Sequence, residues 1–170
     1  MTPIHWAAFR GHTEIVKILA PLTDNPNAPN KDGDMPIHMA AKYGYTKIVE
    51  FLAPLTDNPN APNNVGDTPI QWAAQNGHTE IVKLLAPLTD NPNAPDKYGE
   101  TPIHEAARNG HTEIVKILAP LTDNPNAPNK NGETPSSLTK NAGIRRILNI
   151  SRKRKAGPNS KPSMKQAKKF

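Results

Sequence analysis

The chain contains no cysteine among its 170 residues. Disulfide bonds and cysteine-ligated zinc sites are therefore excluded, which suits a reducing compartment. Aromatic residues make up only 5% of the chain, and no apolar stretch approaches the length of about 18 residues that a membrane-spanning helix needs. The amino terminus also lacks a basic segment followed by an apolar run. We therefore predict neither a secretory signal peptide nor a membrane span.

Proline, by contrast, is abundant and regularly placed. Of the 19 prolines, 16 fall on four places of a 33-residue period in the four full repeats, namely those of Pro3, Pro21, Pro26 and Pro29 in the first period. Periodic proline marks the boundaries of repeated elements rather than low complexity. The sequence therefore predicts one domain over residues 1–151. It divides into repeats 2–34, 35–67, 68–100 and 101–133 and a terminal unit 134–151.

Each repeat carries the signals of two short helices. In the first repeat Thr2 is a good N-cap, and Pro3 is a good first helical residue because it lacks only an N–H that would be unpaired there. This helix is expected to run to about Arg10. Gly11 then supplies a left-handed residue, and Thr13 opens a second helix.

The second helix has an apolar stripe at helical spacing. Its members are Ile15, Val16, Ile18, Leu19 and Leu22. Because proline inside a helix costs about 3 kcal/mol, we expect this helix to stop near Ala20. Pro21 would then open a separate turn that Leu22 anchors to the core. The repeat closes with a stretch rich in Asn and Asp, in which Gly33 allows a tight turn.

The repeats resemble those of the ankyrin family. TPIHWAAFRGHTEIVKIL and its three counterparts are similar to the TPLHxAAxxGHxEIVxLL core of that family, and NPNAPNKDG is similar to its DxNAxxxxG segment. The resemblance covers about residues 1–150. It implies an all-α solenoid of stacked helix-turn-helix units with projecting β-turn fingers. It also implies a non-enzymatic role in protein recognition, and we expect a monomer.

The two ends of the array differ. The terminal unit carries polar residues where the others have apolar or small ones, namely Lys140, Asn141, Arg145, Arg146 and Asn149, as a C-terminal cap would. At the other end Met1 directly precedes the first repeat, so Ile4 and its apolar neighbours are expected to lack a covering unit. We interpret the chain as a fragment or incomplete product of a longer array. The near-identity of the repeats leaves both recent duplication and engineering open.

The six histidines suggest a metal or acid–base site, but their pattern argues against one. His5 and His12 are seven residues apart, yet the intervening glycine breaks the helix, so the two imidazoles do not share a helix face. Gln71 stands where other repeats have histidine. The first histidine of each repeat is expected to form internal hydrogen bonds. No catalytic or cofactor motif is present, so we predict no metal, no cofactor and no enzymatic activity.

The repeats differ from one another at only a few positions, on one helix face and at the finger tips. In an ankyrin-like stack these positions line the concave groove, and their aromatic, Met and Arg content is typical of a binding hot spot. The predicted partner-binding residues are Trp6, Phe9, Arg10, Met39, Lys42, Tyr43, Trp72, Gln75, Asn76, Tyr98, Glu105 and Arg108. The alternative is that Trp6 and Trp72 are merely buried and that the other positions drifted. The partner itself is unknown from the sequence.

The carboxyl-terminal segment 152–170 is strongly basic. It contains eight Lys or Arg residues and no Asp or Glu, whereas residues 1–151 have a formal charge of −2. We predict a disordered tail that resembles a nuclear import signal and binds an import receptor, through Arg152, Lys153, Arg154, Lys155, Lys165, Lys168 and Lys169. This predicts a nuclear location, with a cytoplasmic one as the alternative. Nonspecific contact with nucleic acid or chromatin, with the repeats as scaffold, is the competing function, and no function is the third reading.

Overall fold

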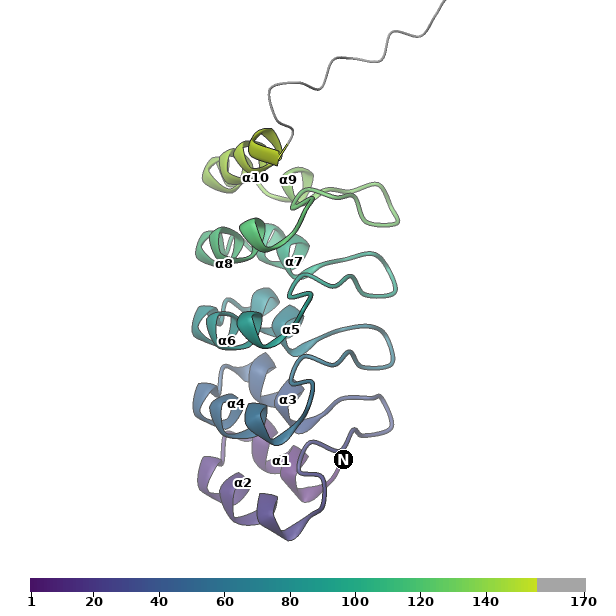
Figure 1. The fold of residues 1–170 in the computed structure, drawn as a ribbon, viewed down its shortest axis with the longest axis vertical. Helices are drawn as coiled ribbons and strands as arrows, with labels where there is room; N and C mark the ends of the chain where they lie inside the picture. Colours follow the sequence, from purple (N-terminus) through teal and green to yellow (C-terminus); the bar gives the residue numbers. More distant parts are fainter. Residues whose placement is uncertain (156–170) are drawn as a thin grey trace, which may run out of the picture.

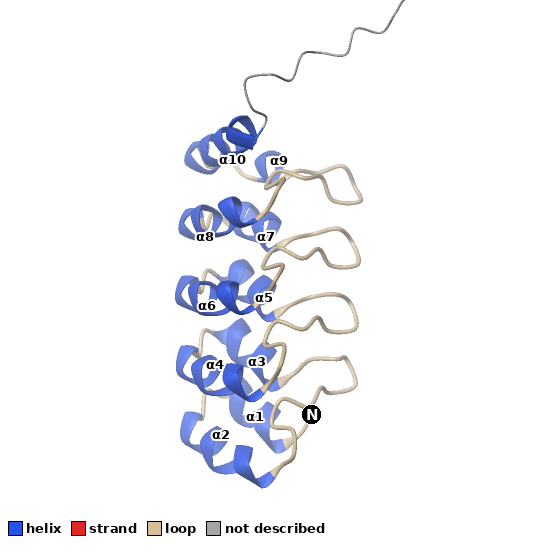
Figure 2. Ribbon diagram, in the orientation of Figure 1, coloured by secondary structure: helices blue, strands red, loops and turns tan. Residues whose placement is uncertain are grey.

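The structure, a computed structural model, describes residues 1–155 as a stack of helix pairs with loops projecting from one edge (Figure 1). The described residues contain helices and loops but no strand (Figure 2). The four full repeats give α1 Pro3–Phe9, α2 Thr13–Leu19, η1 Ala20–Leu22, α3 Pro36–Tyr43, α4 Thr46–Leu52, η2 Ala53–Leu55, α5 Pro69–Asn76, α6 Thr79–Leu85, η3 Ala86–Leu88, α7 Pro102–Arg108, α8 Thr112–Leu118 and η4 Ala119–Leu121. The terminal unit gives α9 Pro135–Leu138 and α10 Ala142–Lys155.

The helix boundaries follow from proline and glycine. Each first helix begins at the predicted proline and ends within a residue or two of the predicted position. Gly11 has a φ of +73°, as the sequence predicted for the residue between the two helices. The second helix stops at Leu19, before Pro21, and a single 3-10 turn over Ala20–Leu22 follows. This confirms that the repeated proline ends the helix rather than kinking it.

The prediction for Leu22 is wrong. Its side chain is 76% exposed, and its counterparts Leu55, Leu88 and Leu121 are also exposed. The 3-10 turn holds three residues before the chain becomes extended at the next threonine, so the leucine lies at the end of the element and beyond the packed helices. The repeat is therefore held together without this leucine.

The core lies between the two columns of helices. Helices α1, α3, α5, α7 and α9 pack on one another in one column, and α2, α4, α6, α8 and α10 form the other. Interior residues such as Ile48, Leu52 and Leu85 have no exposed surface. In the first repeat no unit packs on the outer side, so Ile15 and Ile18 of α2 are exposed. Ile4, which the sequence placed among the uncovered residues, is instead buried under α3.

The constant asparagine of the repeated NPNAP segment joins neighbouring units. Asn60 is buried, and its Oδ1 accepts a hydrogen bond of 3.0 Å from the backbone N–H of Ile70 at the start of the next unit. Asn93 makes the same bond to Ile103 at 3.1 Å. Successive fingers are also joined by backbone bonds, such as Asn64 N to Asp32 O at 3.0 Å. Buried backbone groups need partners, and this need explains why the segment is constant.

The terminal unit covers the last full repeat. Ile144 and Leu148 of α10 are fully buried beside α8, whereas Arg145, Arg146 and Asn149 are exposed. Helix α10 continues to Lys155, four residues past the boundary that the sequence predicted at 151. The first basic cluster therefore belongs to the last turn of a helix. Residues 156–170, with Lys165, Lys168 and Lys169, lie outside the described residues.

Candidate partner-binding surface

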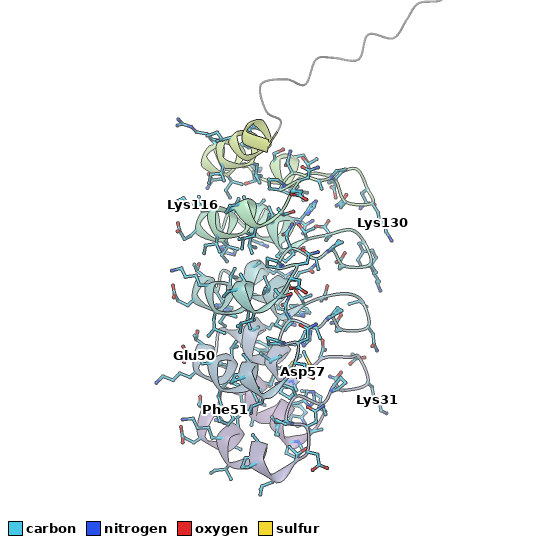
Figure 3. All side chains as sticks on the ribbon, in the orientation of Figure 1. Lys31, Glu50, Phe51, Asp57, Lys116 and Lys130 are labelled. Atoms are coloured by element: carbon cyan, nitrogen blue, oxygen red, sulfur yellow. The ribbon has the colours of Figure 1, made fainter. Side chains whose placement is uncertain are left out.

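Most of the predicted partner-binding residues lie on the first helices of the repeats. We call the face made by these helices, α1, α3, α5 and α7, the helix-one face, and it borders the bases of the fingers. Tyr98 stands apart from it on a finger and is exposed. Lys31 and Lys130 also project from finger tips (Figure 3). The finger tips therefore carry positive charges along an edge of the stack that is separate from the helix-one face.

An aromatic cluster occupies the helix-one face of the first two repeats. The Trp6 and Phe9 rings are 5.8 Å apart, and Phe9 meets Tyr43 of the next repeat at 5.0 Å, both edge to face. Trp6 is 52% exposed and Tyr43 is also exposed. Edge-to-face pairs fix ring orientation, so these exposed aromatics are held rigidly. The alternative that Trp6 is merely buried is therefore excluded.

Two cations extend this cluster. Lys42 Nζ lies 4.1 Å from the ring centre of Trp72, and the Arg10 guanidinium lies 5.6 Å from that of Phe9. Such cation–π contacts stabilise each side chain in place. Trp72 is only partly exposed, and its Nε1 has no hydrogen-bond partner among the described residues. Lys42 thus connects the aromatic cluster of the first two repeats to Trp72 of the third repeat.

In the third and fourth repeats, acidic residues gather where the helix-one face meets the fingers, and we call this region the acidic half of the surface. Arg108 pairs with Glu105, and it pairs with Glu100 at 2.8 Å. Burial alone would lower the pKa of Arg108, but the two carboxylates outweigh it and raise the pKa. Glu105 is only 9% exposed, so it is less accessible than the sequence-based prediction of a contact residue required. Its carboxylate is already committed to Arg108.

A small cavity lies within this acidic half. Its volume is about 70 Å3, and its lining residues are Asp67, Gln71, Trp72, Gln75, Asp96 and Glu105. Burial raises the pKa of Asp67, and the carboxylates of Asp96, Asp34 and Glu105 raise it further, while Lys97 opposes them. The sequence-based prediction included Trp72, Gln75 and Glu105 but missed the other three. Comparison of the repeats at the positions of Gln71 and Asp96 would have revealed two of them.

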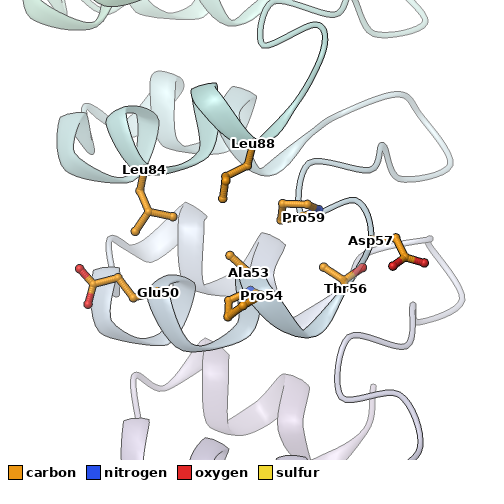
Figure 4. A pocket seen from close by; sticks show the side chains of 8 residues that line it. All are labelled: Glu50, Ala53, Pro54, Thr56, Asp57, Pro59, Leu84 and Leu88. Atoms are coloured by element: carbon orange, nitrogen blue, oxygen red, sulfur yellow. The ribbon is translucent and has the colours of Figure 1, made fainter.

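A second hollow, of about 370 Å3, lies between η2 and the following unit (Figure 4). Its lining residues are Glu50, Ala53, Pro54, Thr56, Asp57, Pro59, Leu84 and Leu88. Most of them belong to the constant PLTDNPNAP segment, so most of this lining is the same in every full repeat. It offers little means of distinguishing one partner from another.

The histidines that follow Pro-Ile in three of the repeats, His5, His38 and His104, form internal hydrogen bonds, as the sequence predicted. His38 Nδ1 accepts from the backbone N–H of Met35 at 3.1 Å, so Nε2 carries the proton and donates to Asp67 O at 3.2 Å. His5 and His104 are bonded in the same way to the equivalent carbonyls. Within residues 1–155 no three His, Asp or Glu side chains come together in a way that could hold a metal ion.

These histidines make the stack sensitive to acid. Burial lowers the pKa of His38 to about 4, although the Asp34 carboxylate opposes this shift, and burial also lowers the pKa of His5 and His104. Above pH 6.5 the imidazole is neutral in both states. Between about pH 6.5 and 4 the unfolded chain binds a proton that the folded chain refuses, so stability falls as the pH falls.

We therefore expect His38→Gln to flatten the pH dependence of unfolding, since Gln71 shows that the fold accepts glutamine at this position. A shift from 6.5 to about 4 corresponds to a difference on the order of 3 kcal/mol over the whole window. Urea unfolding of both chains at pH 7.5 and 4.5 measures it. Equal losses in the two chains would contradict the assignment to His38.

Comparison with known proteins agrees with this architecture. A family model described as ankyrin repeats in three copies matches residues 1–63 and 55–129. No curated protein matches the chain. Among residues 1–155 none of the helices combines the length and the apolar character needed to cross a membrane. With the stacked helix pairs and fingers described above, these matches show that the chain belongs to the ankyrin-repeat family, whose members are generally protein–protein interaction modules.

Proposed function

We propose that the chain binds a protein partner through the helix-one face and the adjoining fingers. The observation that carries this proposal is the aromatic cluster of Trp6, Phe9 and Tyr43, which is exposed and yet held by ring contacts across two repeats. Rigid, amphipathic rings lose little conformational entropy on binding, which is why tyrosine and tryptophan dominate hot spots.

The charge distribution on this surface favours one orientation of a bound partner segment. Arg10 and Lys42 flank the aromatic cluster, whereas Glu105 of α7 lies with the finger residues Asp67 and Asp96 around the small cavity beside Trp72. A partner segment with acidic groups at one end and basic groups at the other would match both halves. Charge complementarity of this kind sets orientation and association rate more than affinity.

Peptides selected from a random phage-displayed library on the purified chain test the proposal. We expect Tyr43→Ala and Trp6→Ala each to weaken the selected peptides by about tenfold or more, in the range of aromatic hot spots. Leu88→Ala is the matched control, because Leu88 is exposed but belongs to the repeated hollow. Peptides that bind Tyr43→Ala and Trp6→Ala as well as the unchanged chain would refute the proposed surface.

The nuclear location remains a proposal from the sequence. It is based on Arg152, Lys153, Arg154 and Lys155, and on Lys165, Lys168 and Lys169. Clusters of this composition suit extended import-receptor grooves that read lysine charges. Deleting residues 156–170 would remove the second cluster and leave the helix pairs intact.

A further inference from the structure

The small cavity beside Trp72 is built from residues that are unusual within this chain. Gln71 occupies the position of His5, His38 and His104, and Asp96 occupies the position of Asn30, Asn63 and Asn129. Glu105 stands where the other repeats have tryptophan or methionine. The repeats are otherwise nearly identical, so three departures converge on one cavity of about 70 Å3. Independent drift has no reason to gather them there.

The exchange of asparagine for aspartate changes a link between fingers. Elsewhere the asparagine Nδ2 donates to the carboxylate that ends the preceding finger: Asn63 donates to Asp34 at 2.8 Å, and Asn129 donates to Glu100 at 2.6 Å. Asp67 is the equivalent carboxylate below Asp96. Asp96 has no N–H to offer it, so an attractive contact is replaced by two like charges. The pKa of Asp67 is raised first by burial and next by the charge of Asp96, which agrees with this repulsion.

Asp96 still stabilises its own finger, as the asparagines at the equivalent positions do. Its Oδ1 accepts from the backbone N–H groups of Tyr98 at 2.8 Å and Glu100 at 2.9 Å, as the asparagines do in the other fingers. Asparagine would therefore serve the finger equally well. What aspartate adds is the charge on Oδ2, whose partner is Gln71 Nε2 at 3.3 Å.

The exchange of histidine for glutamine leaves an unused acceptor. Gln71 is only 5% exposed, and its Oε1 has no hydrogen-bond partner among the described residues. A buried, unpaired acceptor is costly and calls for a donor. The cavity therefore presents the Gln71 carbonyl oxygen and the carboxylates of Asp67 and Asp96, beside Glu105, which is paired with Arg108, and the unpaired Nε1–H of Trp72. These three acceptor groups favour a cation that can donate several hydrogen bonds.

The chain's own described cations leave this demand unmet. Arg108 is held by Glu105 and Glu100, and Asp67 and Asp96 form no ion pair within residues 1–155. Lys42 lies over the Trp72 ring and Lys97 lies over the Tyr98 ring, and neither lysine is among the residues that line the cavity. Since a water needs roughly 10–15 Å3 of such space, the cavity has room for an ammonium or guanidinium group.

We propose that this cavity takes a lysine or arginine side chain of the protein partner, whose charged group bridges Asp67 and Asp96 and donates to Gln71 Oε1. The site rests on the proposed function, because it would bind the basic end of the partner segment proposed above. It is separate from the aromatic cluster, so the two can be tested apart. The stem of the inserted side chain would lie along the Trp72 ring.

The first test uses n-butylammonium chloride, which reproduces the lysine side chain. The chain has two tryptophans, so their indole N–H signals in a nitrogen-15 spectrum report separately on the cavity and on Trp6. At pH 7.5 we expect a saturable shift of the Trp72 signal that is absent with n-butanol and with sodium chloride at equal ionic strength. A missing or unsaturable Trp72 shift would overturn the proposal.

Two variants restore what the other repeats have, so both are expected to fold. Asp96→Asn and Gln71→His should each weaken the butylammonium effect by about tenfold, whereas Asp57→Asn, an exposed aspartate of the repeated hollow, should not. Asp96→Asn should also raise the thermal midpoint, since it replaces a repulsion by a hydrogen bond. An undiminished Trp72 shift in Asp96→Asn, or a lower midpoint, contradicts the site.

The selected peptides provide the second test. A lysine in such a peptide, replaced by norleucine, should cost about tenfold in affinity for the unchanged chain and less than about twofold for Asp96→Asn. Equal losses on both chains overturn the cation site while leaving the proposed function standing. If Trp6→Ala and Tyr43→Ala leave the affinity for the selected peptides unchanged, the proposed function fails, whatever the result of the butylammonium titration.

Discussion

Leu85→Ala is expected to destabilise the stack by about 2–5 kcal/mol, as large-to-small substitutions in cores do. Leu85 is fully buried on α6, which packs against α4 and α8. In a repeat stack each unit contacts only its neighbours, so damage in the third repeat weakens both of its interfaces. The first two repeats should then unfold at a lower urea concentration than the last ones, and amide hydrogen exchange resolves the two halves.

Leu88→Ala is the matched control, three residues further along the same segment. Leu88 is 49% exposed at the end of η3, so its truncation should cost less than about 1 kcal/mol. The pair separates two views of the repeated Pro-Leu: the leucine as an anchor, which the sequence suggested, or as a surface residue. A loss in Leu88→Ala equal to that in Leu85→Ala would restore the anchor.

Gly44→Ala is expected to have a comparable effect through two separate costs. Gly44 has a φ of +78°, where a residue with a Cβ loses about 1–2 kcal/mol. A Cβ there would also lie 2.6 Å from Cε1 of His78 in the next repeat. That ring cannot move away freely, because its Nε2 lies 3.1 Å from the backbone oxygen of Lys42. Overpacking of this kind adds about 1–3 kcal/mol.

Gly110→Ala isolates the backbone cost. Gly110 has the same φ of +78°, and a Cβ built on it meets no atom within 4 Å. Thermal or urea unfolding of the two variants should therefore differ by the clash alone, and His78→Ala in the Gly44→Ala background should recover most of that difference. Equal losses at the two glycines would show that the contact between repeats does not limit the packing.

The aromatic half of the candidate surface was largely predictable, whereas the acidic half was not. Trp6, Phe9 and Tyr43 occupy positions that vary between repeats, and the resemblance to ankyrin repeats implied that these positions share one face. Asp67 and Asp96 are 29 residues apart, and each is an ordinary finger residue when considered alone. Their proximity depends on the stacking of fingers. Glu105 was predicted as a contact, but its burial against Arg108 also depends on packing between repeats.

The sequence by itself determined the local structure: where each helix begins and ends, and how often the pattern recurs. Proline and glycine act on the dihedral angles of their own positions, so their effects can be read without knowing the neighbours. Only the tertiary structure decided that Leu22 and its counterparts face solvent, that Ile4 is covered, and that two carboxylates meet beside Gln71. Burial and the distance between charges depend on which surfaces the stack brings together. Both are set by the packing of neighbouring repeats, so the sequence of a single repeat does not determine them.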